Sequence, residues 1–204
     1  MPHRPTAEAD ASIDVRVEPA TADRWGDVVT LLGGNGDLGC WCQAWRGADA
    51  AFGRGEPGAN RLRLRRQVES GDFTPGLIAY LGEEPVGWIG LGPRAAMPRL
   101  VASRTIPTAD AQPVWSIGCF RIRVGYRRRG VAKALLAAAV EHARAVGAPG
   151  IEAYPIDPEG RRIDVGFGFV GFTPMFEAQG FRRVLLTDAH SAGRPRWLMR
   201  LDFA

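Results

Sequence analysis

The chain has 204 residues, of which 46% are hydrophobic and 24% are charged, and its formal net charge is +4. This composition is typical of a globular domain, and one domain of this length can bury a sizeable core. The sequence lacks an apolar run of the ~20 residues that a membrane span requires, and residues 1–12 lack the apolar segment of a secretory signal. We therefore expect a loose tail over 1–12, one folded domain over 13–204, no membrane association and a cytoplasmic location.

Arginine supplies nearly all of the positive charge, because Lys133 is the single lysine of the chain. With abundant alanine and glycine, this usage is typical of a GC-rich bacterial genome and by itself indicates no polyanionic partner. The densest basic cluster consists of Arg61, Arg63, Arg65 and Arg66. Leucines alternate with these arginines and no aromatic platform accompanies them, so we interpret the cluster as a solvated helix face and disfavour nucleic-acid binding.

The three cysteines do not form an even disulfide framework, which fits a reducing compartment. Cys40 and Cys42 lie close to Trp41 and Trp45 in a glycine-rich segment, for which three interpretations are open. A metal site is disfavoured, because the spacing is Cys-x-Cys, no second pair exists and the histidines are scattered. The segment can instead be a buried hydrophobic plug. It can also line a substrate pocket, with the two tryptophans as flat walls.

The first half of the chain contains five predicted elements. They are a strand over 13–17, helices over 24–32 and 61–70, and strands over 76–81 and 86–91. Alternating apolar and polar residues predict the first strand, glycines end the first helix, and Asn60 is a suitable N-cap for the second. Four turn-forming residues between the last two strands predict an antiparallel hairpin. The connection over 95–113 is long, so we expect it to flank a pocket.

The centre of the sequence predicts a strand, a basic turn and a helix in succession. The strand covers 114–124, the helix begins near Gly130, and Gly147 ends it. Arginines occupy the three turn positions 127–129. A helix N-terminus presents free backbone N–H groups and a favourable dipole to an anion. Three arginines beside such a terminus therefore predict a site for a phosphate or pyrophosphate.

The last part of the chain predicts a strand over 151–154, a loop over 157–170, a short helix over 175–179, and strands over 181–186 and 196–201. Thr173 and Pro174 are suitable as N-cap and first residue of the short helix. A strand, a helix and a strand in succession place 151–154 parallel to 114–124 through a right-handed crossover.

The central segment resembles the GNAT superfamily of N-acetyltransferases. Its pattern Arg127-x-x-Gly130-x-Ala132, between an apolar strand and an alanine-rich helix, is similar to the acetyl-coenzyme A loop of that family. The nucleotide-binding patterns Gly-x-x-x-x-Gly-Lys-Ser/Thr and Gly-x-Gly-x-x-Gly do not occur there.

A second segment, Phe176-x-x-x-Gly180-Phe181, resembles the family's Tyr-x-x-x-Gly-Phe. The two motifs span roughly 114–186, and the order of elements extends the likeness over most of 13–204. The resemblance implies an α/β fold of the GNAT type. In that fold helices flank a central, mixed, twisted sheet that contains a splayed pair of parallel strands.

The resemblance further implies acetyl-coenzyme A (acetyl-CoA) as co-substrate, and we expect no metal. Backbone N–H groups in the turn would hold the pyrophosphate, with charge-assisted contacts from arginine side chains. Main-chain groups on the strand would contact the pantetheine arm and polarise the thioester carbonyl. The residues expected at this site are Arg121, Ile122, Arg127, Arg128, Arg129, Gly130, Val131 and Ala132.

Phe176 stands where the family has a tyrosine that often protonates the departing thiolate, and a phenyl ring cannot donate a proton. Either another group does so, or the thiolate leaves unassisted, which a thiol pKa near ~8.5 tolerates. Alternation along the 151–154 strand turns Glu152 toward the splay, so we expect Glu152 as the base and Tyr154, on the same face, as the acid. Asp157 is an alternative base, and Glu152 can instead be the ion-pair partner of an arginine. Cys119 lies mid-strand with no histidine nearby in sequence, which disfavours an acyl-cysteine route.

The implied reaction is direct transfer of an acetyl group from acetyl-CoA to a primary amine. The aromatic-rich first part of the chain, with Trp41 and Trp45 as expected substrate-binding residues, favours a small-molecule amine over a protein tail. Two alternatives are a module that binds acyl-CoA without turnover and an enzyme that acetylates a protein amine. We expect a monomer or a homodimer.

Overall fold

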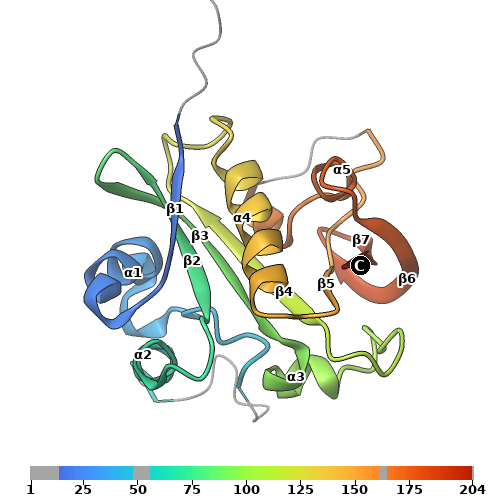
Figure 1. Cartoon of the computed structure of the whole chain (residues 1–204), viewed down its shortest axis with the longest axis horizontal. Helices are drawn as coiled ribbons and strands as arrows, with labels where there is room; N and C mark the ends of the chain where they lie inside the picture. Colours follow the sequence, from blue (N-terminus) through green and yellow to red (C-terminus); the bar gives the residue numbers. More distant parts are fainter. Residues whose placement is uncertain (1–13, 48–55, 161–164, 204) are drawn as a thin grey trace, which may run out of the picture.

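The computed structural model describes residues 14–47, 56–160 and 165–203, so the predicted tail over 1–12 lies outside the described residues. Its centre is a seven-stranded sheet with the order β1-β2-β3-β4-β5-β7-β6 (Figure 1). Only the neighbours β4 and β5 are parallel, and the other pairs are antiparallel. The strands are β1 (Arg16–Pro19), β2 (Gly76–Leu81), β3 (Glu84–Pro93), β4 (Trp115–Ile122), β5 (Gly150–Ala153), β6 (Arg182–Ser191) and β7 (Arg194–Asp202).

The α-helices are α1 (Trp25–Leu32), α2 (Ala59–Ser70), α3 (Pro98–Val101), α4 (Val131–Ala145) and α5 (Thr173–Glu177). Short 3-10 helices are η1 (Ala22–Arg24), η2 (Gly33–Leu38), η3 (Arg94–Ala96) and η4 (Val165–Val170). The connection over 95–113, expected to be a loop, therefore contains most of η3 and all of α3. In the described part of the chain, no helix is long and apolar enough to cross a membrane.

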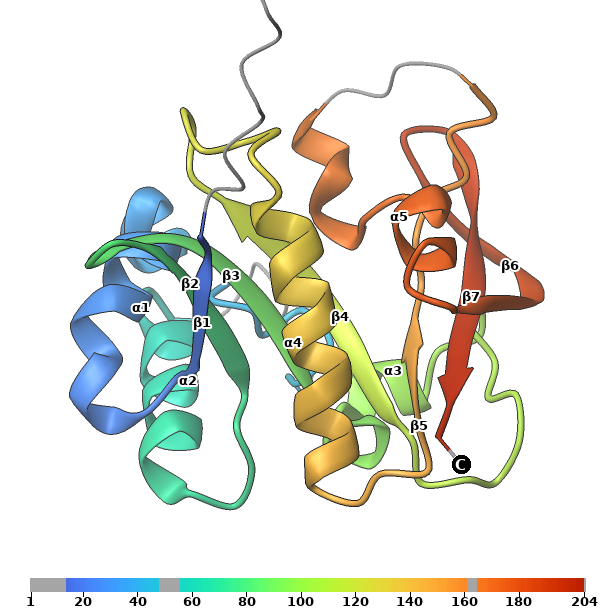
Figure 2. The ribbon, with the colours of Figure 1, turned by 45° about the horizontal axis from the view of Figure 1, so that its top comes forward.

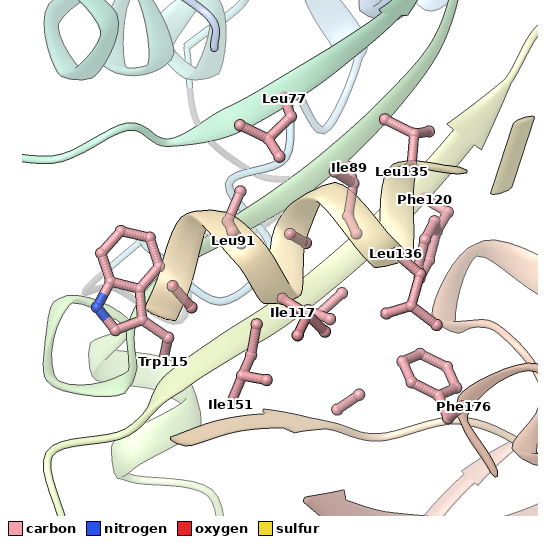
Figure 3. Close-up of a cluster of buried hydrophobic side chains, with 14 of the residues drawn as sticks. Leu77, Ile89, Leu91, Trp115, Ile117, Phe120, Leu135, Leu136, Ile151 and Phe176 are labelled. Carbon is pink, nitrogen blue, oxygen red and sulfur yellow. The ribbon is translucent and has the colours of Figure 1, made fainter. Parts of the chain in front are cut away.

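The two faces of the sheet carry separate hydrophobic clusters, because side chains alternate along each strand. On β2, Leu77 and Ala79 belong to the cluster beneath α4, whereas Ile78 and Tyr80 belong to the cluster beneath α1 and α2. Figure 3 shows Leu135 and Leu136 of α4 among the apolar side chains of β2, β3 and β4. The sheet is thus covered by helices on both faces, and the mixed α/β architecture is confirmed.

Strands β4 and β5 pair over a very short stretch. Their register joins Trp115 to Ile151 and Ser116 to Glu152, and β4 then continues to Ile122 without a partner on this side. Figure 2 shows the two strands close together at one end and separated at the other. The splayed parallel pair is therefore confirmed, and the edge of β4 beyond Ser116 keeps free backbone hydrogen-bonding groups.

Phe176 is fully buried in the main hydrophobic cluster. Its ring meets those of Phe120 and Phe181 edge to face, with centroids 6.1 Å and 5.2 Å away. This packing agrees with the interpretation that the residue in the tyrosine position serves as a core aromatic.

Gly76 is a position where the sheet requires the smallest residue. A Cβ atom there would lie 2.2 Å from the ring of Trp88, so Gly76→Ala should lower the free energy of unfolding by about 1–3 kcal/mol. Gly26→Ala is the matched control, because its Cβ would meet nothing within 4 Å in α1 and should raise stability by about 0.5–1 kcal/mol. Urea unfolding of both variants measures the difference, and equal effects would contradict this packing.

Candidate active site

The turn between β4 and α4 presents free backbone N–H groups at a helix N-terminus. Gly130, the residue before α4, has a φ of 79°, and Arg128 also lies in the left-handed region, with a φ of 63°. The N–H of Ala134 bonds to the carbonyl of Gly130 at 3.0 Å, so the preceding amides of the first turn have no helical acceptor. With the neighbouring arginines, these amides have the geometry and charge that suit an anion.

A pocket of about 350 Å³, here called the β4–α4 pocket, opens beside this turn. Seven of the eight residues expected at the cofactor site line it, and they are Arg121, Ile122, Arg127, Arg128, Gly130, Val131 and Ala132. Arg129 does not line the pocket, and its guanidinium lies 5.6 Å from the centre of the Tyr126 ring. Lys133 and Tyr126 also line the pocket. Lys133 follows the motif directly at the helix start, so its charge was a signal that the sequence analysis missed.

The opposite wall of the β4–α4 pocket comes from the segment around η4 and α5. Its lining residues are Gly168, Phe169, Gly171, Phe172 and Met175. Two hydrogen bonds fix the segment, from the N–H of Ile156 to Gly171 and from the N–H of Thr173 to Ile156. This segment therefore covers the opening between β4 and β5, and pattern reading along the chain did not predict that contact.

A second pocket, of about 330 Å³, is here called the Trp45 pocket. It is lined by Cys40, Cys42, Ala44, Trp45, Arg46, Met97, Arg99, Gly118, Cys119, Phe169 and Arg196. Phe169 lines both pockets. Gly118 and Cys119 of β4 line the Trp45 pocket, and the next residue, Phe120, lines the β4–α4 pocket. The two pockets therefore adjoin at Phe169 and along β4.

The two tryptophans expected at the substrate site have different places. Trp45 lines the second pocket. Trp41 is only 2% exposed, stacks on Trp25 at 6.1 Å and lines neither pocket. The Cys40–Arg46 segment is thus a hydrophobic plug at Trp41 and a pocket wall at Cys40, Cys42 and Ala44–Arg46, which combines two of the three interpretations.

The basic cluster on α2 packs against the same plug. The guanidinium of Arg61 lies over the Trp41 ring at 5.6 Å, and that of Arg65 lies over Trp25 at 5.9 Å and pairs with Glu69. The expectation that no aromatic ring accompanies these arginines was therefore incorrect, but the rings are those of the protein's own core.

Arg196 is a buried cation at the Trp45 pocket, with 6% of its surface exposed. Its Nε donates to the carbonyl of Tyr154 at 2.7 Å, and its guanidinium lies 5.7 Å from the ring centre of Trp45. Burial lowers the pKa of Arg196 to about 10, so it stays protonated at neutral pH. No carboxylate among the described residues pairs with it, which leaves its charge available to an anionic ligand.

Glu152 and Tyr154, the expected base and acid, lie in a buried polar network rather than in either pocket. The Glu152 carboxylate accepts hydrogen bonds from Arg94 at 3.3 Å and from the Tyr154 hydroxyl at 3.1 Å. The hydroxyl in turn accepts from Arg94 at 2.6 Å. Burial raises the pKa of Glu152 and that of Tyr154. The alternative that Glu152 is the partner of an arginine therefore describes its place, and the pH–rate profile of a Glu152→Gln variant tests whether it also acts as the base.

Asp157, the alternative base, is held outside both pockets as well. It accepts a hydrogen bond from the N–H of Glu159 at 2.9 Å and pairs with Arg183 at 2.5 Å, and these contacts lower its pKa. A group of three or more metal-ligating His, Cys, Asp or Glu side chains does not occur among the described residues.

Comparison with known proteins identifies the class to which this fold and site belong. The model of the GNAT acetyltransferase family matches residues 43–162, which is more than half of the chain, and the chain therefore belongs to that family. The resemblance seen in the sequence is thus confirmed. No curated protein sequence matches the chain.

Solved structures share the fold at low sequence identity. A ribosomal-protein-alanine N-acetyltransferase from Brucella melitensis is 13% identical, with 92% of this chain and 99% of that chain covered and a TM-score of 0.54. A GNAT acetyltransferase from Bacillus cereus is 14% identical, with 93% and 97% covered and a TM-score of 0.53.

The buried network gives a prediction for Glu152→Gln. Glu152 is the carboxylate that pairs with Arg94 in the described part of the chain, so its loss leaves a buried cation unpaired and should cost about 3–5 kcal/mol of unfolding free energy. The pH dependence of acetyl transfer by the folded fraction should stay unchanged, because the carboxylate touches neither pocket. Glu141→Gln, at an exposed pair on α4, is the control and should change stability by less than ~1 kcal/mol. A displaced limb of the pH–rate profile in Glu152→Gln alone would show that Glu152 titrates in catalysis.

Proposed function

We propose that this chain transfers the acetyl group of acetyl-CoA directly to a primary amine of a small molecule. One observation carries the proposal: the anion-binding β4–α4 pocket and the Trp45 pocket adjoin at Phe169 and along β4. Two substrates held in adjoining pockets can react without a covalent enzyme intermediate, and their fixed orientation supplies much of the rate acceleration.

The β4–α4 pocket suits CoA in both charge and shape. The amides of Val131, Ala132 and Lys133 would hold the pyrophosphate, with Arg127 and Arg128 adding charge-assisted bonds. The free edge of β4 would pair with the amide groups of the pantetheine arm. When bound there, acetyl-CoA supplies an activated acetyl group beside Phe169.

The Trp45 pocket supports a small acceptor that carries an anionic group such as a carboxylate. Three of its lining side chains are arginines, and none of the described residues that line it is an aspartate or a glutamate. The buried charge of Arg196, which has no carboxylate partner among the described residues, supports a bidentate contact with the acceptor. The flat ring of Trp45 would pack against the rest of the molecule.

The polar network beneath this pocket would act by positioning. Glu152 and Arg94 hold the Tyr154 side chain, and the Tyr154 carbonyl holds Arg196. Phe176 cannot protonate the CoA thiolate, and the pKa of ~8.5 for a free thiol lets this group leave unassisted.

Acetylation of a protein amine is the second candidate. One structural neighbour is, by its name, a ribosomal-protein-alanine N-acetyltransferase, but it shares the fold at only 13% identity. The bounded volume of the Trp45 pocket, about 330 Å³, and its buried cation favour a small acceptor.

CoA binding can be tested with two aspartates at opposite ends of α4. Gly130 and Gly147 have similar φ angles, 79° and 76°, and a Cβ at either position would meet nothing within 4 Å. The backbone strain of an aspartate is therefore matched. Only Gly130→Asp places a carboxylate beside the pyrophosphate, which should weaken CoA binding on the order of 100-fold, equivalent to about 3 kcal/mol. Calorimetry that finds the same affinity in both variants would refute this cofactor site.

Acceptor preference can be tested by thiol release with amino acids and their amides. The carboxylate raises the pKa of the neighbouring ammonium group, so free amine chemistry favours the amide. We expect the enzyme to prefer the acid. Arg196→Gln should raise the KM for the acid about tenfold or more, which corresponds to a loss of ~1.4 kcal/mol of binding free energy. The KM for acetyl-CoA should not change.

Two further variants serve as controls for this test. Arg66→Gln removes an exposed arginine of α2 and should behave as wild type. Arg196→Lys keeps the charge but lacks the planar guanidinium, so its KM for the acid should lie between those of the wild type and Arg196→Gln. A preference for amides in the wild type would contradict an anionic acceptor.

A further inference from the structure

Two thiols meet at the inner wall of the Trp45 pocket. The Sγ atoms of Cys42 and Cys119 are 2.9 Å apart, although 77 residues separate them in sequence. Both cysteines line the pocket, and neither is part of the acetyl-transfer machinery proposed above. A disulfide bond is about 2.05 Å long, so a movement of less than ~1 Å would join the two sulfurs.

The glycine opposite Cys119 leaves the room that this contact needs. Gly90 pairs with Cys119, and a Cβ atom at Gly90 would lie 2.1 Å from Cys42 Sγ and 3.3 Å from Cys119 Sγ. The same Cβ would lie 3.2 Å from the Nε1 atom of Trp88. The two sulfurs and the indole N–H therefore converge on one small space above Gly90.

Packing holds Cys42 in this position against a backbone preference. Trp41 and Cys42 have φ angles of 45° and 56°, which side chains other than glycine rarely adopt. The Trp41 ring stacks on Trp25, its Nε1 donates to the carbonyl of Gly36 at 3.0 Å, and the N–H of Gln43 bonds to Cys40 at 2.8 Å. The contact between the thiols is thus maintained by the surrounding structure.

The surroundings of the pair stabilise a thiolate on Cys42. A hydrogen bond from the Cys119 thiol and the charge of Arg46 lower the pKa of Cys42 to about 6, whereas the same contact raises the pKa of Cys119. The Nε and Nη1 atoms of Arg46 and the Nε1 atom of Trp88 are buried and have no oxygen or nitrogen partner. Arg46 has no carboxylate partner among the described residues, so the thiolate is its available counter-ion.

We propose that Cys42 and Cys119 form a redox pair that hydroperoxides convert into a disulfide within the Trp45 pocket. The Cys42 thiolate attacks one peroxide oxygen, the O–O bond breaks, and hydroxide or alkoxide leaves as Cys42 becomes a sulfenic acid. The Cys119 sulfur then displaces the sulfenic oxygen as water, with its own thiol proton completing the balance. Two thiols and one hydroperoxide thus yield one disulfide, one water from the second step, and one further molecule from the first step, which is water for hydrogen peroxide and an alcohol for an organic hydroperoxide.

The disulfide would change the pocket wall. It removes the anion beside Arg46 and ties the Cys40–Arg46 segment to β4, next to Trp45. The β4–α4 pocket contains neither cysteine. This expectation rests on the proposed function: oxidation should lower the rate of acceptor acetylation about tenfold, which corresponds to ~1.4 kcal/mol of activation free energy. The affinity for CoA should stay within about twofold of that of the reduced chain.

The chemistry is tested by mass spectrometry of the full chain, reduced, freed of reductant and treated with equimolar hydrogen peroxide. The wild type should lose the mass of two hydrogens, yield a linked Cys42–Cys119 peptide and recover its mass with a dithiol reductant. Cys40→Ser is the control for the linkage, because Cys40 is an exposed cysteine two residues from Cys42, and this variant should lose the same mass and yield the same linked peptide as the wild type. An unchanged mass, or a linked peptide that contains Cys40, would overturn the proposal.

Single variants identify the order of events. Cys119→Ser should retain a sulfenic acid on Cys42 that a dimedone reagent traps, and Cys42→Ser should form no disulfide. Trapping on Cys119 instead would overturn the assigned order. If the disulfide forms and acceptor turnover does not change, the pair does not control the pocket. If the reduced chain acetylates no amine, the proposed function fails while the redox assignment still stands on the mass data.

Discussion

The site depends on how little of β4 is paired with β5. Only two residue pairs join these parallel strands, at Trp115 and Ser116, and the rest of β4 runs free to Ile122. A fully paired sheet would leave no room for a ligand at its centre, because its backbone groups would bond to one another. The unpaired edge is what brings two pockets to one strand, and the segment around η4 covers the gap from the other side.

Both pockets carry positive charge, whereas the buried carboxylate of Glu152 lies outside them. The first turn of α4 and its arginines make one end of the β4–α4 pocket positive. Arg196 gives the Trp45 pocket a second, buried positive charge, held by a main-chain carbonyl. The carboxylate of Glu152 is used inside the fold, where it neutralises Arg94. The proposed enzyme therefore attracts anionic groups at both pockets and keeps its buried acid for structure.

The sequence predicted the local parts of this molecule and the parallel pairing of β4 with β5, and it missed the side-chain contacts between distant segments. Periodicity and glycine placement located α4 and the arginine-rich turn before it, because those features depend on neighbouring residues. Alternation predicted correctly that Glu152 and Tyr154 share a face but not that Arg94, 58 residues away, would occupy that face with them. Phe169, the inward packing of Trp41 and the contact between Cys42 and Cys119 likewise arise from tertiary packing, which a single sequence does not encode at any fixed spacing.

A crystal structure of the chain with acetyl-CoA tests the central claim most directly, since that claim is a spatial one. We predict that the pyrophosphate bonds to the amides of residues 131–133, that the pantetheine arm follows the free edge of β4, and that the acetyl group lies beside Phe169, facing the Trp45 pocket. Acetyl-CoA bound elsewhere, or an acetyl group that points away from the Trp45 pocket, would contradict the account.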